Sequence, residues 1–213
     1  MKRFNQAFTI LILLLLGAGV SLPGVAEKSP ATLSQPQAIA LSTMPIAAGH
    51  FVQRKYFKVL KQPIKSQGEL YFDVNIGLLW QTNKPLYSAL LLKPNGLFTE
   101  NSSGVSQELK GASLLSQVLL DILSGDSDKI AANFSIDNSE DKHCLNLSPQ
   151  LPQLAKIINI VQLCHIDEQS SNQAQQNDIN HIVLHEHSGN RTEIDVQLTP
   201  LPVLPEAIRA RLQ

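Results

Sequence analysis

The sequence predicts an α+β domain that is mainly β and is built on an antiparallel sheet. Two runs of strand-forming residues within 51–80 flank a polar connection at 62–68, which contains proline and glycine and predicts a hairpin. In the second run Leu70, Phe72 and Val74 alternate with more polar neighbours. Because successive side chains point to opposite faces of a strand, one face of this strand is predicted to be apolar.

The same pattern recurs further along the chain. After an irregularity expected at Gly77, Leu78 and Trp80 continue the apolar face. A Pro-Asn-Gly turn separates two more strands at 86–93 and 97–100. Later strands are predicted at 134–136, 144–147 and 157–164, and a last hairpin over 179–198 turns at 188–190.

One longer segment has helical periodicity. From 112 to 123 apolar residues recur at spacings of three and four, with a serine placed to cap the start and a glycine to end it. A shorter helix is predicted to follow, capped by Asp126 or Ser127. The proline-rich segment 200–205 is expected to lie along a sheet edge before a short helix at 206–212.

The N-terminus has the features of an export signal. Lys2 and Arg3 precede an uninterrupted apolar run at 10–16, and Gly24-Val25-Ala26 places small residues where a signal peptidase cleaves. An uncleaved anchor is the alternative, although the apolar run is short for a membrane span. The predicted organisation is a signal peptide at 1–26, a flexible lead with a short weak helix at 27–49, and one domain at 50–213.

Composition excludes several classes of function. The chain has 213 residues, a net charge of −1 and 16% charged residues, against roughly 25% in an average soluble domain. No basic stretch typical of nucleic-acid binding and no acidic run stands out. The sequence lacks a G-x-S-x-G elbow, an H-E-x-x-H motif and a phosphate-binding glycine loop. We therefore expect a monomeric binding protein, not an enzyme, with no cofactor, which meets its partners by apolar contact or specific docking.

Cys144 and Cys164 are the only cysteines. In an exported protein, two cysteines on strands that are expected to be neighbours are predicted to form one disulfide, and two separate buried thiols are the alternative. On the chain-entropy model, a closed loop of about 20 residues contributes roughly 3 kcal/mol. A zinc site is disfavoured because no C-x-x-C pair is present.

Three histidines on the last hairpin have a spacing that can bind a metal. His181, His185 and His187 are expected on one face of a strand, and two histidines separated by one residue can ligate a transition metal. No carboxylate or cysteine is visibly paired with them in the sequence. The preferred interpretation is therefore a solvated polar face beside a turn.

Several short motifs occur in a characteristic order. They are F-x-Q-x-K at 51–55, P-x-x-S-x-G at 63–68, G-L-L-W at 77–80, Pro85, N-G-L at 95–97, Gly125-Asp126, L-x-L-x-P at 145–149 and the late hairpin around Gly189. In this order and spacing the chain resembles the LolA-like family of periplasmic outer-membrane lipoprotein carriers, nearest to the branch usually encoded beside membrane lipid exporters. The resemblance implies a curved antiparallel sheet that forms an incomplete β-barrel, covered by a few helices, in the periplasm of a Gram-negative bacterium.

The resemblance also implies that the sheet and the covering helix enclose an apolar cavity. A lipid chain needs such shelter because each methylene exposed to water costs about 0.8 kcal/mol. The candidate wall residues are Leu70, Phe72, Val74, Leu78, Trp80, Leu90 and Leu92, and the candidate lid residues are Leu115, Val118, Leu119 and Ile122. Each is equally a candidate for ordinary core, because alternation does not distinguish the wall of a cavity from a filled interior.

Two positions depart from the family pattern. Val74 stands where the founding carriers have an arginine that holds their lid closed, and Cys144 stands where the exporter-linked branch often has a tryptophan. Both departures favour a specialised lipid or acyl-conjugate cargo. The resemblance therefore predicts a periplasmic carrier that shelters a lipid or acylated cargo for transfer between membranes, with a membrane lipid exporter or an outer-membrane acceptor as candidate partners. The alternative is a non-transporting module that senses lipids or docks on an exporter.

Overall fold

The computed structural model describes residues 45–110, 120–122, 127–139, 141, 143–165 and 179–213. The predicted signal peptide and nearly all of the predicted lead lie outside these residues. None of the helices in the described part of the chain is long and apolar enough to cross a bilayer.

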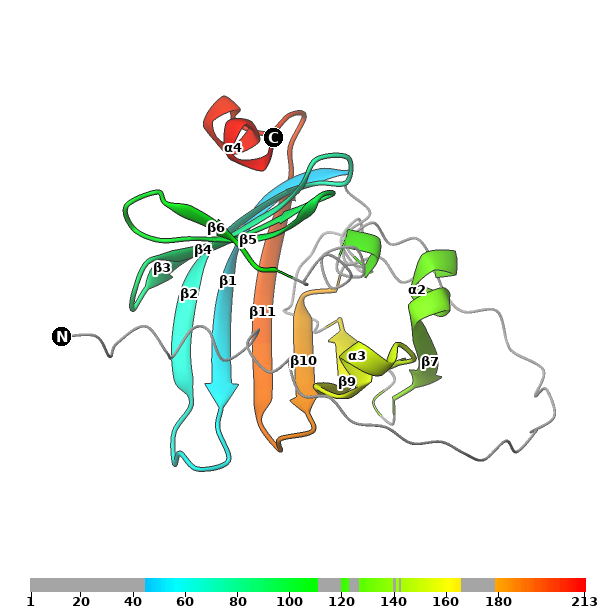
Figure 1. Ribbon diagram of the computed structural model, residues 1–213. Helices are drawn as coiled ribbons and strands as arrows, with labels where there is room; N and C mark the ends of the chain where they lie inside the picture. Colours follow the sequence, from blue (N-terminus) through cyan, green and yellow to red (C-terminus); the bar gives the residue numbers. More distant parts are fainter. Residues whose placement is uncertain (1–44, 111–119, 123–126, 140, 142, 166–178) are drawn as a thin grey trace, which may run out of the picture. The chain divides into compact units, whose positions relative to one another are not determined.

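The described strands form one antiparallel sheet, which Figure 1 shows as a curved surface. Its strand order is β6-β5-β4-β3-β2-β1-β11-β10-β9-β8-β7, so the first and last strands of the domain are neighbours at its centre and the sheet is not closed into a barrel. This confirms the predicted fold class. In chain order the elements are β1 (Ile46–Tyr56), β2 (Ile64–Asp73), β3 (Gly77–Lys84), β4 (Ser88–Lys93), β5 (Gly96–Glu100), β6 (Ser106–Glu108), α2 (Ser127–Asn133), β7 (Phe134–Asn138), β8 (Cys144–Pro149), α3 (Pro152–Ala155), β9 (Ile158–Cys164), β10 (His181–Glu186), β11 (Arg191–Pro200) and α4 (Glu206–Leu212).

The central hairpin differs from the prediction at the start of each of its two strands. β1 begins at Ile46, ahead of residue 50, where we expected the domain to start. β2 begins at Ile64, so most of the predicted connection at 62–68 is strand that pairs with β1. Gly68 belongs in this strand because a Cβ at that position would lie 1.9 Å from the backbone oxygen of Gln81 on β3. Glycine therefore permits a close approach of two strands and does not end one.

The register divides the sheet into two chemically different faces. Directly paired residues project to the same face, so the register of neighbouring strands identifies the members of each face across the sheet. The apolar face carries Leu147, Val161, Ile182, Ile194, Val196, Phe51, Leu70, Phe72, Leu78, Trp80, Leu90, Leu92 and Leu97. The polar face, over the central strands, carries Gln162, His181, Asp195, Arg54 and Glu69.

Helix α4 packs on the polar face, against β3 and β4. Its Leu212 forms a small separate core with Leu204, Leu79 and Leu91. The predicted terminal helix is confirmed, but the edge position expected for 200–205 is wrong. β11 is a central strand, and beyond it the chain carries Leu204 into this core, where the side chain is 2% exposed.

Two further helices, α2 and α3, lie beside strands β7 to β9, and a third helical segment is the end of the helix predicted at 112–123. α2 occupies the position predicted for the second, shorter helix and contacts β7, while α3, which the sequence did not suggest, contacts β8 and β9. Residues 120–122 are helical, in agreement with the predicted helix at 112–123.

Candidate functional site

Six of the seven predicted wall residues lie together on the apolar face. They form two cross-strand rows through β2, β3 and β4, with Leu70, Trp80 and Leu90 in one row and Phe72, Leu78 and Leu92 in the next. Trp80 and Leu90 are half-buried and the other four side chains are buried. The alternation in the sequence therefore located a continuous apolar surface correctly.

Val74, the seventh wall candidate, does not belong to this surface. β2 ends at Asp73, and Val74 lies in the turn before β3 with its side chain 41% exposed. The alternation of apolar residues continues past the end of the strand, because a turn residue can be apolar without facing the sheet. Val74, which stands where the founding carriers have an arginine, is therefore a turn residue in this chain.

Phe51 of β1 is a member of the apolar face that our wall candidates omitted. Its ring centroid lies 4.0 Å from that of Trp80, with an angle of 32° between the ring planes, and it is 1% exposed. It reaches Trp80 because it is paired with Gly68, which has no side chain to separate the two rings. Alternation in β1 does not single it out, because Gln53 and Lys55, the next residues on the same face of the strand, are polar.

The apolar face continues over the half of the sheet that our wall candidates did not include. Val196 and Ile194 of β11 extend it from Phe51, and Ile182, Leu163 and Val161 carry it onward to β10 and β9. All of these except Ile182 are buried. The strands themselves were predicted, but their order in the sheet was needed to see that one apolar surface spans both halves.

Of the predicted lid residues, only Ile122 lies within the described part of the chain, where it is helical and half-buried. Leu115, Val118 and Leu119 lie outside the described residues. The neighbouring Asp121 is 7% exposed, and its carboxylate lies 4.0 Å from the ammonium group of Lys129 on α2. The end of this helix is therefore connected to α2 by an ion pair.

A buried ion pair lies on the apolar face near the β1–β2 loop. The Nζ atom of Lys55 lies 2.8 Å from Oε1 of Glu186 on β10, and the two side chains are only 10% and 11% exposed. Burial raises the pKa of Glu186, but hydrogen bonds from Lys55, Ser188 and Asn190 outweigh it and hold the pKa below its usual value. Glu186 is therefore ionised at neutral pH, and the pair ties the end of β1 to the β10–β11 hairpin.

A second charged cluster, on the polar face, involves one of the predicted histidines. Asp195 accepts a hydrogen bond from Arg54 at 2.5 Å, and Nδ1 of His181 lies 2.7 Å from its other carboxylate oxygen. Burial raises the pKa of Asp195, but the hydrogen bonds and charges of Arg54 and His181 lower it by more. The pKa of Asp195 therefore lies below its usual value. Our expectation that no carboxylate pairs with these histidines is wrong for His181, because its partner comes from the neighbouring strand.

The three histidines do not share one strand face. His181 and His185 do, but the ladder of β10 shifts after His185, the strand ends at Glu186, and His187 lies exposed in the turn. Within the described residues, no group of three or more His, Cys, Asp and Glu side chains is positioned to hold a metal ion.

Cys144 and Cys164 form the predicted disulfide. They are directly paired residues of β8 and β9. A hollow of about 350 Å³ lies beside the disulfide and is lined by Asp141, His143, Cys144, Gln162, Cys164, His165 and His181. Gln162 and His181 are hydrogen-bonded to neighbouring strands, through Asn146 and Asp195, so these two groups hold the sheet together.

No protein-family model and no curated protein matches the chain. Several solved structures are similar to it. A LolA superfamily protein is among them. That relative, from Nitrosomonas europaea, is 13% identical in sequence and superposes with a TM-score of 0.49. The match covers 80% of the chain described here and 91% of the Nitrosomonas chain. A DUF1329 family protein from Desulfovibrio piger is 12% identical with a TM-score of 0.46, over 81% and 93%.

A third similar structure is a putative outer membrane lipoprotein-sorting protein domain from Vibrio parahaemolyticus, which is 9% identical with a TM-score of 0.41, over 76% of this chain and 88% of its own.

Proposed function

We propose that this protein shelters a lipid or the acyl chain of a lipidated cargo against the apolar face, and carries it across the periplasm between membranes. The observation that carries the proposal is the extent of that face, which runs without interruption from β4 through the centre of the sheet to β8. Hydrocarbon gains about 0.8 kcal/mol for each methylene that leaves water, so a broad apolar wall favours an acyl chain over a compact polar ligand.

The half-buried members of the face are the ones expected to touch the cargo. Trp80 and Leu90 are paired across β3 and β4 and retain more exposure than their neighbours Leu70 and Leu92. An aromatic ring offers a large flat surface to a hydrocarbon chain and loses little conformational entropy when the chain binds. Trp80, which stacks on Phe51, is therefore the residue on which we expect a bound chain to lie.

Two buried hydroxyl groups on the apolar face could orient such a cargo. Thr82 and Thr192 are 2% and 0% exposed, and neither hydroxyl has a hydrogen-bond partner in the part of the chain that the structure describes. A buried donor without a partner is unfavourable by about 1–3 kcal/mol. An ester or amide carbonyl of a lipid would accept a hydrogen bond from either group, which favours an acyl ester or amide over a simple alkane.

The disulfide supports the proposed compartment. A disulfide between cysteines 20 residues apart persists in an oxidising environment such as the periplasm. The predicted signal peptide would deliver the chain there. Transport between membranes is the part of the proposal that requires a donor and an acceptor.

The proposal is tested by lipid content and by quenching of the single tryptophan. Mass spectrometry of lipids extracted from gently purified protein is expected to detect co-purified acyl lipid. Lipids with brominated acyl chains are expected to quench the fluorescence of Trp80. A matched control, Trp80→Phe with Phe98→Trp, moves the fluorophore to the polar face beside the small core and should not be quenched. Protein without lipid, combined with unquenched Trp80, would contradict the proposal.

A further inference from the structure

The loop between β1 and β2 exposes aliphatic side chains at its tip. Val59 is 88% exposed, Leu60 is 50% exposed, and Ile64, at the start of β2, is 44% exposed. Three large aliphatic residues within six positions, all open to water, are unfavourable unless another surface covers them. No packing role within the described part of the chain accounts for Val59.

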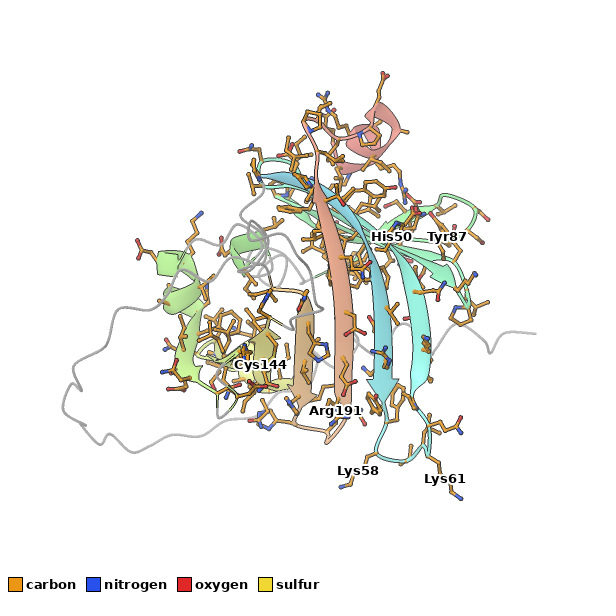
Figure 2. All side chains as sticks on the ribbon, turned by 180° about the vertical axis from the view of Figure 1, so that it is seen from behind. His50, Lys58, Lys61, Tyr87, Cys144 and Arg191 are labelled. Atoms are coloured by element: carbon orange, nitrogen blue, oxygen red, sulfur yellow. A yellow bond between two sulfur atoms is a disulfide. The ribbon has the colours of Figure 1, made fainter. Side chains whose placement is uncertain are left out.

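The same segment is the most basic part of the sequence. Residues 54–65 contain five of the 17 Lys and Arg residues and no Asp or Glu, although the whole chain has a net charge of −1. Arg54 and Lys55 are paired with carboxylates across the sheet. Lys58, Lys61 and Lys65 form no ion pair with any described residue. Figure 2 shows the side chains of Lys58 and Lys61 pointing outward on opposite sides of the loop.

Contacts with the neighbouring hairpin hold the loop in this arrangement. The backbone N–H of Lys58 donates a hydrogen bond to the side-chain oxygen of Asn190 at 3.1 Å. The N–H of Leu60 donates to the carbonyl of Phe57 at 2.9 Å, which closes a turn. At the base of the loop, the guanidinium of Arg191 lies 4.5 Å from the centre of the Tyr56 ring. The loop is therefore preformed, so binding would require little further ordering.

We propose that this basic, aliphatic tip (residues 57–65) docks on the surface of an anionic phospholipid membrane. Val59 and Leu60 enter the boundary between headgroups and acyl chains, while Lys58, Lys61 and Lys65 meet the phosphate groups above it. A membrane presents these two chemistries in this order, with negative charge outside and hydrocarbon beneath. A narrow projecting tip suits that layered surface better than a protein partner, since stable protein interfaces bury about 800 Å² on each side.

The test is the binding of the exported protein to vesicles of phosphatidylethanolamine and phosphatidylglycerol, with phosphatidylcholine vesicles for comparison. Wild-type protein is expected to float with the anionic vesicles, to bind less as salt is raised, and to bind the neutral vesicles weakly. Each lysine near an anionic surface contributes about a fivefold change in affinity, so Lys58→Gln with Lys61→Gln should weaken binding on the order of 10- to 30-fold. Val59→Ser with Leu60→Ser should weaken binding by about tenfold or more.

A matched control carries the same chemical changes elsewhere. Val203 is 54% exposed and Lys110 is also exposed. Val203 follows β11 and Lys110 follows β6, and both strands end at the side of the sheet opposite the β1–β2 loop. Val203→Ser with Lys110→Gln should bind vesicles as the wild type does.

The proposal is overturned if wild-type protein fails to bind anionic vesicles, in which case the tip would instead serve a protein partner. It is also overturned if the loop variants bind as tightly as the control. Vesicle binding is measured separately from lipid content, so either proposal can fail without the other.

Discussion

The ion pair between Lys55 and Glu186 should make a large contribution to stability for a single interaction. Both side chains are about nine-tenths buried, and removing one member of a buried pair leaves the other charge without compensation, which typically costs 3–5 kcal/mol. In Lys55→Met, Glu186 keeps hydrogen bonds from Ser188 at 3.0 Å and Asn190 at 3.3 Å. We therefore expect a loss at the lower end of that range, about 3 kcal/mol.

The neighbouring residue supplies a matched control. Arg54 pairs with Asp195 on the opposite face of the same strand, but these side chains are 34% and 40% exposed, so Arg54→Met should cost less than about 1 kcal/mol. Urea unfolding with the disulfide intact measures both losses. In Lys55→Met with Glu186→Met no charge is left uncompensated, and we expect most of the lost stability to return. Equal losses in Lys55→Met and Arg54→Met would refute the argument that burial decides the strength of the pair.

Three further predictions concern the stability of the sheet. Because the pKa of Glu186 lies below its ordinary value of 4.5, its contribution to stability is complete above about pH 4.5 and is lost as the pH falls through the folded-state value; Lys55→Met should flatten this part of the stability curve measured by urea unfolding. Replacing both Cys144 and Cys164 with Ala should lower the unfolding free energy by roughly 3 kcal/mol, and a reducing agent should then have no further effect on the variant's melting temperature. Gly68→Ala places a Cβ 1.9 Å from a backbone oxygen of the next strand and should cost about 2 kcal/mol or more in thermal unfolding, and a neutral result would show that β2 and β3 separate easily.

Local patterns in the sequence predicted much of the fold. Alternation predicted the strands from β2 to β5, and turn residues at 94–96 and 188–190 separated the right pairs of strands. The short helix at α4 and the disulfide were also predicted correctly. These features depend on residues close together in the chain, or on chemistry that few residue types can provide.

The remaining features depend on contacts between distant parts of the chain. Gly68 has the sequence character of a strand breaker, and only the closeness of the next strand explains it. Val74 continues the alternation of β2 although the strand has already ended. Lys55 and Glu186 are 131 positions apart, so no local pattern could pair them. Six of the seven wall candidates lie on one face, but the sequence could not separate a cavity wall from a filled core.

The two outermost strands of the described sheet offer a neighbouring molecule little backbone to pair with. β6 has three residues, all exposed, and β7 has five, among them the exposed Asp137. A neighbouring molecule that added a strand to either margin would gain a short ladder, interrupted by charge at β7. A chain with so wide an apolar sheet is thereby protected, while it folds, against adding strand to strand into fibrils.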